Sequence, residues 1–256
     1  MNLQLSHLPL YNNDLKSLPN KKLLINTINA HCYNIAQNDR VYVNALQKSD
    51  VLLPDGISIV LAKRILDSRS INKIAGSDLF FYEMERLNKS GGKCFFLGSS
   101  NETLAKIKVR ASIMYPMVKI KYYSPPFVAK FTKHDNNIML KVINCFKPDV
   151  LFIGMTAPKQ EKWAYENFDN LNVGHICTIG AVFDFFAGTV SRAPNWIIKI
   201  GFEWLYRLYK EPRRLWRRYL IGNFVFIYLI LKEKTQSLLC KLYAEKLPNE
   251  AQRIKK

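Results

Sequence analysis

The stretch DVLFIGMTAPKQEKWAYENF, residues Asp149–Phe168, contains the unit from which the fold is predicted. Residues Asp149–Ile153 form a nearly continuous apolar run, which is typical of a strand buried on both faces. Gly154 then interrupts the run, and Pro158 is placed to begin a helix, because proline is favoured in the first helical turn. A buried strand followed closely by a helix is the repeating unit of α/β folds.

The same unit recurs on both sides of this stretch. Short aliphatic and aromatic runs bounded by Gly, Pro or polar residues predict five further strands, at Lys22–Asn26, Asp50–Leu53, Lys93–Leu97, Val118–Tyr123 and Gly174–Ile179. Helix-length segments lie between them, at Ala30–Gln37, Arg40–Lys48, Ile57–Leu66, Asp78–Asn88, Glu102–Met114 and Asp135–Phe146. This alternation predicts an α/β fold with a mostly parallel sheet flanked by helices.

The C-terminal part of the chain differs in charge and is predicted to be an appendage. The 256 residues carry a net charge of +18, and residues 192–256 hold 15 Lys and Arg against 5 Asp and Glu. We therefore place an α/β core at residues 1–191 and a basic, aromatic-rich helical appendage at 192–256, with Pro212 dividing the basic region into two helices. The excess charge indicates an anionic partner.

Aromatic residues are interleaved with the basic ones of the appendage and lead into an apolar run. This run, Tyr219–Leu231, is too short to span a bilayer, so it is either a buried helix or an interfacial one. Basic and aromatic residues beside such a run suit the headgroup region of an anionic leaflet. The N-terminus lacks the features of a signal peptide and the five cysteines form no C-x-x-C pair, so we expect a cytoplasmic protein with reduced thiols.

The residues that follow the strands are the candidates for chemistry, because ligands of open parallel sheets bind beyond the carboxyl ends of the strands. Thr27 and Asn29 follow the first strand, where helix capping is the competing explanation. Asp55 and Gly56 follow the second; they are either a common turn pair or a general base and its neighbour. Gly98 begins the only glycine-containing hint of a phosphate loop, Gly98-Ser99-Ser100.

Two further strand ends carry polar groups. Lys159 adds a cation near a helix N-terminus that favours phosphate, and Gln160 offers the donor and acceptor that a base edge requires. Glu161 is either part of that site or a first-turn charge that complements the helix dipole. Asp184 stands among large apolar residues, where an unpaired carboxylate is costly. The candidate substrate-binding residues are therefore Asn29, Gly56, Gly98, Lys159, Gln160, Glu161 and Asp184.

Seven motifs occur in an order that resembles the WecG/TagA/CpsF family of glycosyltransferases. They are T-x-N at Thr27–Asn29, P-D-G at Pro54–Gly56, A-G-S-D at Ala75–Asp78, G-x-x-x-P-K-Q-E-x-W at Gly154–Trp163, G-A-x-F-D-F-x-A-G at Gly180–Gly188, R-A-P-x-W at Arg192–Trp196 and E-W-x-Y-R-L-x-x-E-P-x-R-x-x-R-R at Glu203–Arg218. The resemblance extends over roughly residues 20 to 220.

The resemblance implies a Rossmann-like core and an inverting transfer that needs neither a metal nor a cofactor. The donor is implied to be a UDP-sugar and the acceptor a polyprenyl-diphosphate-linked sugar at the inner face of the bacterial cytoplasmic membrane. Asp55 is implied to be the base with Thr27 beside it, the P-K-Q-E segment to hold UDP, and Arg207, Arg214 and Arg217 to complete the site. The donor sugar is left open among N-acetylmannosamine, its uronic acid and glucose, and a homo-oligomer is also left open.

Two other classes of protein compete with this interpretation. A nucleic-acid-binding α/β protein would explain the positive charge and the interleaved aromatic residues, but the apolar run that follows them favours lipid, so no nucleic-acid partner is expected. A nicotinamide-dependent enzyme is disfavoured because the chain has no G-x-G-x-x-G motif. The D-x-D sequence is also missing and the four histidines are spread along the chain, so no metal site is predicted.

Overall fold

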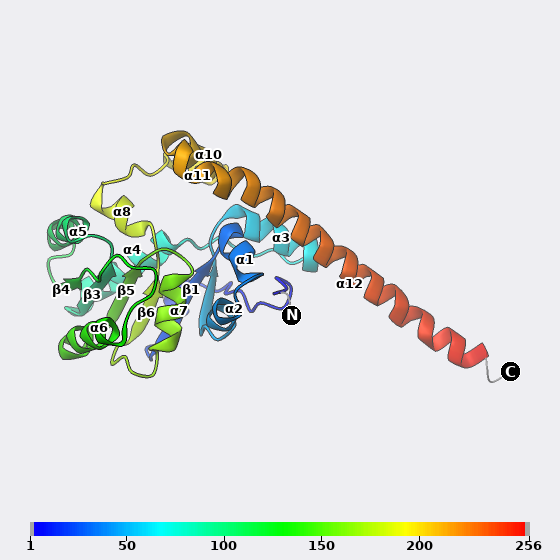
Figure 1. Cartoon of the computed structure of the whole chain (residues 1–256), viewed down its shortest axis with the longest axis horizontal. Helices are drawn as coiled ribbons and strands as arrows, with labels where there is room; N and C mark the ends of the chain where they lie inside the picture. Colours follow the sequence, from blue (N-terminus) through cyan, green and yellow to red (C-terminus); the bar gives the residue numbers. More distant parts are fainter. Residues whose placement is uncertain (1–2, 254–256) are drawn as a thin grey trace.

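A computed structural model describes residues 3–253; the side chains of residues 195, 199 and 241–253 are not described. Its centre is a six-stranded sheet in which all paired strands are parallel, in the order β2-β1-β6-β5-β3-β4 (Figure 1). The strands are β1 (Leu23–Ile28), β2 (Val51–Pro54), β3 (Lys93–Gly98), β4 (Lys119–Tyr123), β5 (Val150–Gly154) and β6 (His175–Thr178). The α/β prediction and its six strands are thus confirmed.

Alternate residues of the central strands face opposite layers of helices. In β3, Cys94 and Phe96 pack beneath α4 and α5, whereas Phe95 and Leu97 pack toward α6 and α7. Every one of these four side chains is buried, which explains why β3 is apolar without interruption from Cys94 to Leu97. The sheet is therefore covered on both faces, and only its ends are open to ligands.

The helices fall into two layers and an extension (Figure 1). Those of the core are α1 (Ala30–Ala36), α2 (Arg40–Gln47), α3 (Ile57–Asp67), α4 (Gly76–Ser90), α5 (Asn101–Met114), α6 (Lys133–Phe146), α7 (Lys159–Glu166) and α8 (Val182–Ala187), with a short 3-10 turn, η1 (Leu15–Ser17). Helices α4, α5 and α8 share one apolar cluster with the sheet, and α6 and α7 share another on the opposite face. The short helix α8 lies where the sequence predicted only a motif.

The appendage consists of helices, and Pro212 divides them as predicted. Its elements are α9 (Asn195–Lys199), α10 (Glu203–Lys210), α11 (Pro212–Trp216), the π-helical turn η2 (Arg217–Ile221) and α12 (Gly222–Arg253). Pro212 occupies the first turn of α11, where its missing N–H costs nothing. From there the chain stays helical through η2 into α12, so the apolar run forms part of a long helix that leaves the body of the molecule (Figure 1).

One face of α12 is anchored on the core. Phe226 and Ile230 are buried in a cluster with residues of α1 and α3, and the ring of Phe226 meets that of Tyr33 edge to face at 5.5 Å. Other apolar residues of the same run, such as Phe224 and Tyr228, are exposed. The run is therefore buried on one side and open on the other. Within residues 3–253, no helix is both long enough and apolar enough to cross a bilayer.

Candidate active site

A cavity of about 1470 Å³ opens at the carboxyl edge of the sheet. The ends of β1, β2, β3, β5 and β6 form its floor, and residues of α8, α10, η2 and α12 close over it. The predicted site residues Thr27, Asn29, Asp55, Gly56, Gly98, Lys159, Gln160, Glu161, Asp184, Arg207 and Arg214 all line it. Arg217 is not among the lining residues; its guanidinium lies over the ring of Trp216, 5.2 Å from the centroid.

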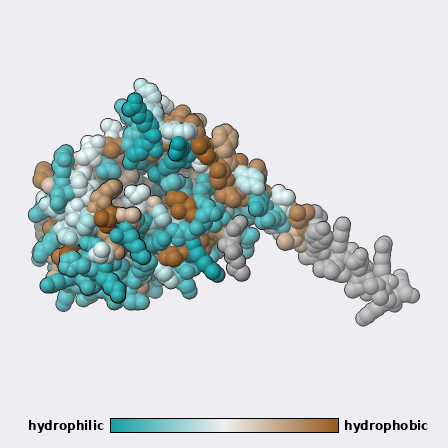
Figure 2. Space-filling model, viewed as in Figure 1, coloured by the Kyte–Doolittle hydropathy of each residue, from teal (hydrophilic) through white to brown (hydrophobic). Residues whose placement is uncertain are grey.

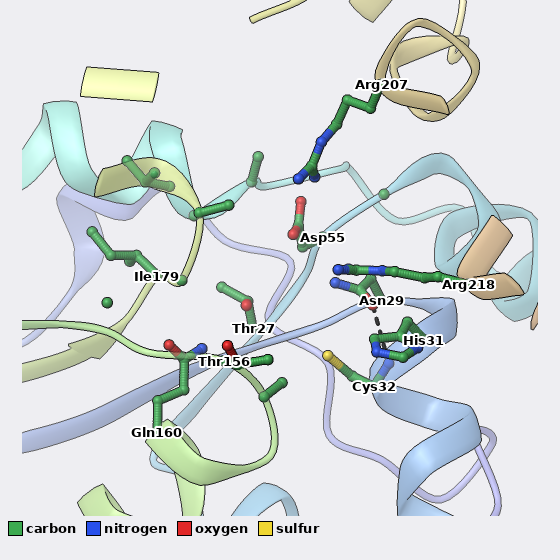
Figure 3. A pocket seen from close by; sticks show the side chains of 18 of the residues that line it. Thr27, Asn29, His31, Cys32, Asp55, Thr156, Gln160, Ile179, Arg207 and Arg218 are labelled. Atoms are coloured by element: carbon green, nitrogen blue, oxygen red, sulfur yellow. Dashed lines mark hydrogen bonds between the residues drawn. The ribbon is translucent and has the colours of Figure 1, made fainter. Parts of the chain in front are cut away.

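Asp55 occupies the centre of the cavity (Figure 3). Its backbone N–H donates to the carbonyl of Ile28 at 2.9 Å, which fixes the residue directly beyond the paired ends of β2 and β1. Burial, reinforced by the nearby carboxylate of Glu203, raises the pKa of Asp55 to about 6, although Lys73 and Arg218 act in the opposite direction. The next residue, Gly56, has a φ of +107°, a conformation that favours glycine. Asp55 is thus a carboxyl group able to take up a proton near neutral pH.

The end of β1 brings two more predicted residues to the same place. Thr27 is buried at the cavity floor, and the side-chain oxygen of Asn29 accepts a hydrogen bond from the N–H of Cys32 at 3.1 Å. Asn29 therefore caps α1 as well as lining the cavity, so both explanations of this residue hold. Burial, followed by the charge of Arg218, lowers the pKa of the adjacent His31 to about 4, which keeps its imidazole neutral.

The neighbouring ends of β3 and β5 both require glycine for a steric reason. A Cβ at Gly98 would lie 2.4 Å from the carbonyl oxygen of Gly154, and one at Gly154 would lie 2.3 Å from the ring of Phe183. Gly98 also has a φ of +118°. The two strand ends and α8 can approach this closely only because side chains are absent, and the close approach shapes the floor of the cavity.

Gln160 and Glu161 form an internal network. The side-chain oxygen of Gln160 accepts from the N–H of Met155 at 3.1 Å, and its nitrogen donates to Glu161 Oε1 at 2.8 Å. The amide that was predicted to face a base edge is therefore already engaged by the protein. Glu161 is fully buried, its Oε2 has no partner among the described residues, and burial raises its pKa to about 7.

Lys159 joins the start of α7 to the loop that precedes α6. Its ammonium group donates to the carbonyl of Val128 and lies 3.6 Å from the centroid of the Phe131 ring. Burial lowers the pKa of this lysine, while Asp135 opposes the shift. Lys159 thus holds one wall of the cavity in place while its charge remains at the rim.

The appendage supplies guanidinium groups from two directions (Figure 3). Arg207 reaches down from α10 toward Asp55, with its guanidinium 5.2 Å from the ring centroid of Phe185. Arg218 enters from η2 beside Asn29 and His31. Arg214 forms an ion pair with Glu211 at 2.6 Å. Burial raises the pKa of Asp184, and the charges of Arg214 and Arg207 oppose this rise without cancelling it. Arg207 lies on α10 and Arg214 on α11, so these two arginines belong to separate helices that Pro212 divides.

Sequence reasoning missed several residues of this cavity, among them Ser77 and Arg218. Ser77 lies in the first turn of α4 within the A-G-S-D motif, to which no role was given, and its hydroxyl is buried without a partner among the described residues. Arg218 was passed over in favour of its neighbour Arg217, because sequence spacing does not show how a π turn rotates a helix. The Nε atoms of Arg207 and Arg218 are likewise buried and unpartnered among the described residues. Such groups around one cavity indicate a polar, anionic ligand.

The comparisons with known proteins agree with this geometry. The model of the Glycosyl transferase WecG/TagA/CpsF family matches residues 9–238. The chain belongs to this family.

Each of three relatives is named N-acetylglucosaminyldiphosphoundecaprenol N-acetyl-beta-D-mannosaminyltransferase. The Bacillus subtilis (strain 168) protein is 34% identical over 77% of this chain and 75% of its own length.

Two further relatives carry that same name. The Bacillus spizizenii protein is 31% identical over 78% of this chain and 76% of its own length. The Staphylococcus aureus (strain MW2) protein is 27% identical over 83% and 81%. All seven motifs of this WecG/TagA/CpsF family member lie within the matched residues, and each of them contributes at least one lining residue to the cavity.

Among the described residues of this WecG/TagA/CpsF family member, no cluster of three or more His, Cys, Asp or Glu side chains could hold a metal ion. The positive charge in the cavity comes from its basic lining residues, which are Lys73, Lys159, Arg192, Arg207, Arg214 and Arg218. Metal independence remains a prediction, which an activity assay in chelator can test.

Proposed function

We propose that this protein transfers N-acetylmannosamine from UDP-N-acetylmannosamine to N-acetylglucosaminyl-diphosphopolyprenol, with inversion at the anomeric carbon. The proposal rests on Asp55, a half-buried carboxyl whose pKa is raised to about 6, placed between two guanidinium groups at the carboxyl edge of the sheet. The names of the relatives supply the sugar, the acceptor and the β linkage of the product.

In the proposed reaction Asp55 is the general base. Its carboxylate accepts the proton of the acceptor hydroxyl while that oxygen forms a bond to the anomeric carbon of the donor. The bond from this carbon to the UDP oxygen breaks on the opposite face, and its electron pair leaves with UDP. Arg207 points toward Asp55 and is placed to offset the negative charge that develops on the leaving diphosphate.

The donor is proposed to occupy the half of the cavity between β5, β6 and the N-terminus of α4. Ser77 offers an unpartnered buried hydroxyl there, and the first N–H groups of a 15-residue helix favour a diphosphate. Lys159 supplies a cation at the rim, and the charges of Arg214 and Arg207 act on the carboxyl of Asp184, which also lines the cavity. Because Gln160 is held by Met155 and Glu161, its proposed role is to shape the floor rather than to bind the base directly.

The appendage is proposed to hold the enzyme on the anionic inner face of the cytoplasmic membrane. Hydrophobic residues gather along the first half of α12, and hydrophilic ones lie over α10 and α11 (Figure 2). Exposed aromatic side chains, among them Trp196, Tyr209 and Trp216, accompany the arginines. Each Lys or Arg near such a surface contributes on the order of 1 kcal/mol of binding. Co-sedimentation with anionic vesicles, without retardation of DNA or RNA in a gel, would separate this proposal from nucleic-acid binding.

The test of the reaction is UDP release from a panel of donors. UDP-N-acetylmannosamine, UDP-N-acetylmannosaminuronic acid and UDP-glucose are each offered with a short-chain N-acetylglucosaminyl-diphosphoprenol, with and without EDTA. We expect release with the first donor, dependent on the acceptor and unchanged by EDTA. A preference for another donor would refute the sugar assignment, and a strict metal requirement would refute the proposed role of the arginines.

A further inference from the structure

The cavity extends beyond Asp55 into an apolar groove between α3 and α12. Its floor consists of Ala62, Phe226 and Ile230, which are all buried. Its walls are apolar side chains that remain about half exposed, with Leu61 at 50% on α3 and Ile227 at 53% on α12. Wall residues recur on each helix at spacings of about one turn, namely Ile57, Leu61 and Ile65 on α3 and Ile227 and Leu231 on α12.

The two helices are fixed relative to each other, so the groove is a permanent feature of the fold. At its outer end, Lys234 donates from its ammonium group to the carbonyl of Leu66 at 3.1 Å, joining α12 to the end of α3. Along its length, Ile59 and Ala62 share a buried cluster with Phe226 and Ile230. The lining residues extend over about 12 Å of each helix, at 1.5 Å per residue. In Figure 1, α3 lies beside the first half of α12.

The inner end of the groove is positively charged. Arg218 lies there, next to Asn29 and His31 and one turn before the groove residue Asn223. Its buried Nε has no partner among the described residues. Because the pKa of His31 is lowered to about 4, the neutral imidazole leaves Arg218 as the cation at this junction. An occupant must therefore be anionic at Arg218 and apolar beyond it.

We propose that this groove binds the first isoprene units of the acceptor's polyprenyl chain, with Arg218 against its diphosphate. The inference rests on the proposed function, which supplies a lipid-linked acceptor. The groove is continuous with the cavity that holds Asp55, so an occupant can be covalently joined to the attacking sugar. The acceptor consists of a sugar, then a diphosphate, then a prenyl chain. Asp55, Arg218 and the α3–α12 groove lie in the same order along the cavity.

The groove is distinct from the surface proposed to meet the membrane. On α12, Val225 and Tyr228 are exposed but do not line the cavity, whereas Ile227 lies between them in sequence and does. Val225, at 42% exposure, is thus a matched control for Ile227: both are β-branched, both are exposed, and they lie two residues apart on one helix. A charge at either position would disturb membrane binding, but only a charge at Ile227 would enter the groove.

The experiment compares two soluble acceptors that differ only in their lipid, one isoprene unit or three, in buffer without membrane or detergent. For the wild-type protein we expect kcat/KM to be at least tenfold higher with the longer lipid, because each methylene removed from water contributes about fourfold. Ile227→Asp and Leu61→Asp should reduce this ratio to near one, whereas Val225→Asp should keep it. Equal kcat/KM for the two lipids in the wild type, or an unchanged ratio in both groove variants, would overturn the proposal.

A second measurement needs neither catalysis nor a variant. A farnesyl diphosphate that carries a diazirine at its far end is bound to the wild-type protein, irradiated, and the adducts are mapped by peptide mass spectrometry. Adducts within residues 57–65 and 223–231 would support the groove, and adducts confined to other parts of the chain would overturn it. If the wild type transfers sugar to neither acceptor, the proposed function fails, and the labelling alone then decides whether the groove binds prenyl chains.

Discussion

The carboxylate of Glu233 accepts the hydroxyl hydrogen of Tyr33 at 2.9 Å, which joins the last helix to the first. The same carboxylate accepts from the N–H of Leu5 at 2.9 Å, and from the N–H and hydroxyl of Ser6 at 2.8 and 2.6 Å. Glu233 is buried, and its four donors come from the N-terminal segment and α1. This contact sets the position of α12, and with it the position of η2 and Arg218 over the cavity.

Replacing this carboxylate should therefore loosen the appendage. In Glu233→Ala the buried donors lose their acceptor, and we expect the free energy of unfolding to fall by roughly 1–3 kcal/mol. Chemical denaturation followed by circular dichroism measures the change. Glu102→Gln serves as the control, because this carboxylate is highly exposed and its removal should have an effect close to zero. Equal losses in the two variants would argue against the anchoring role.

Removing the proposed base should abolish transfer without loss of donor binding. Asp55→Asn keeps the shape of the side chain but cannot accept the proton, so turnover is expected to fall by about 10²–10⁴-fold. Thermal shift with UDP checks that the donor still binds. Asp169→Asn, an exposed position outside the cavity, should leave turnover unchanged. Turnover of Asp55→Asn near that of the wild type would show that another group takes the proton.

The raised pKa of Asp55 predicts how activity depends on pH. The base works only when ionised, so kcat/KM should increase with pH up to the folded pKa of about 6 and then level off. The profile of kcat/KM against pH from 4.5 to 8 measures this limb. Because Glu203 contributes to the shift after burial, Glu203→Gln should move the midpoint to lower pH. A midpoint near 4 in the wild type would contradict the environment described for this carboxyl.

The same shift has a consequence for stability with a definite sign. The pKa of Asp55 is about 6 in the folded protein and 3.8 in the unfolded chain, so the folded protein binds this proton more tightly. The stability that this proton contributes is therefore lost as pH rises from about 4 to about 6. At pH 7, Asp55→Asn should accordingly unfold at a higher denaturant concentration than the wild type. This difference in denaturation midpoint should vanish below pH 4. Denaturant titrations of both proteins at pH 7 and below pH 4 measure it, and equal midpoints at pH 7 would contradict the prediction.

The two adjacent arginines of η2 should behave differently. Arg218 lines the cavity whereas Arg217 lies over Trp216, so Arg218→Met should reduce turnover in detergent by about 10²–10³-fold and Arg217→Met much less. Arg207→Met is expected to resemble Arg218→Met. Vesicle co-sedimentation of the same proteins separates membrane binding from catalysis. A larger loss in Arg217→Met than in Arg218→Met would favour the assignment that the family resemblance implied.

Much of this protein could be predicted from local sequence. Nearly continuous apolar runs such as Asp149–Ile153 predicted the central strands, because a strand covered on both faces has no polar side, whereas the edge strand β4 alternates with exposed lysines. Parallel strands bring their carboxyl ends to one edge, so the motifs after each strand had to converge, and Asp55 and Thr27 do. Pro212 had to end a helix because it lacks an N–H and clashes with the preceding turn.

Other properties depended on side-chain contacts that sequence patterns do not reveal. Gln160 is engaged by Met155 and Glu161, which no spacing rule could reveal. The choice of Arg218 over Arg217 depends on the π turn and on the rotation of α12, and Tyr33 and Glu233 fix that rotation across 200 residues. The apolar run could be classed as buried or interfacial by sequence alone. Only the tertiary structure shows that one face of α12 packs on the core while residues of the same run line a groove beside α3.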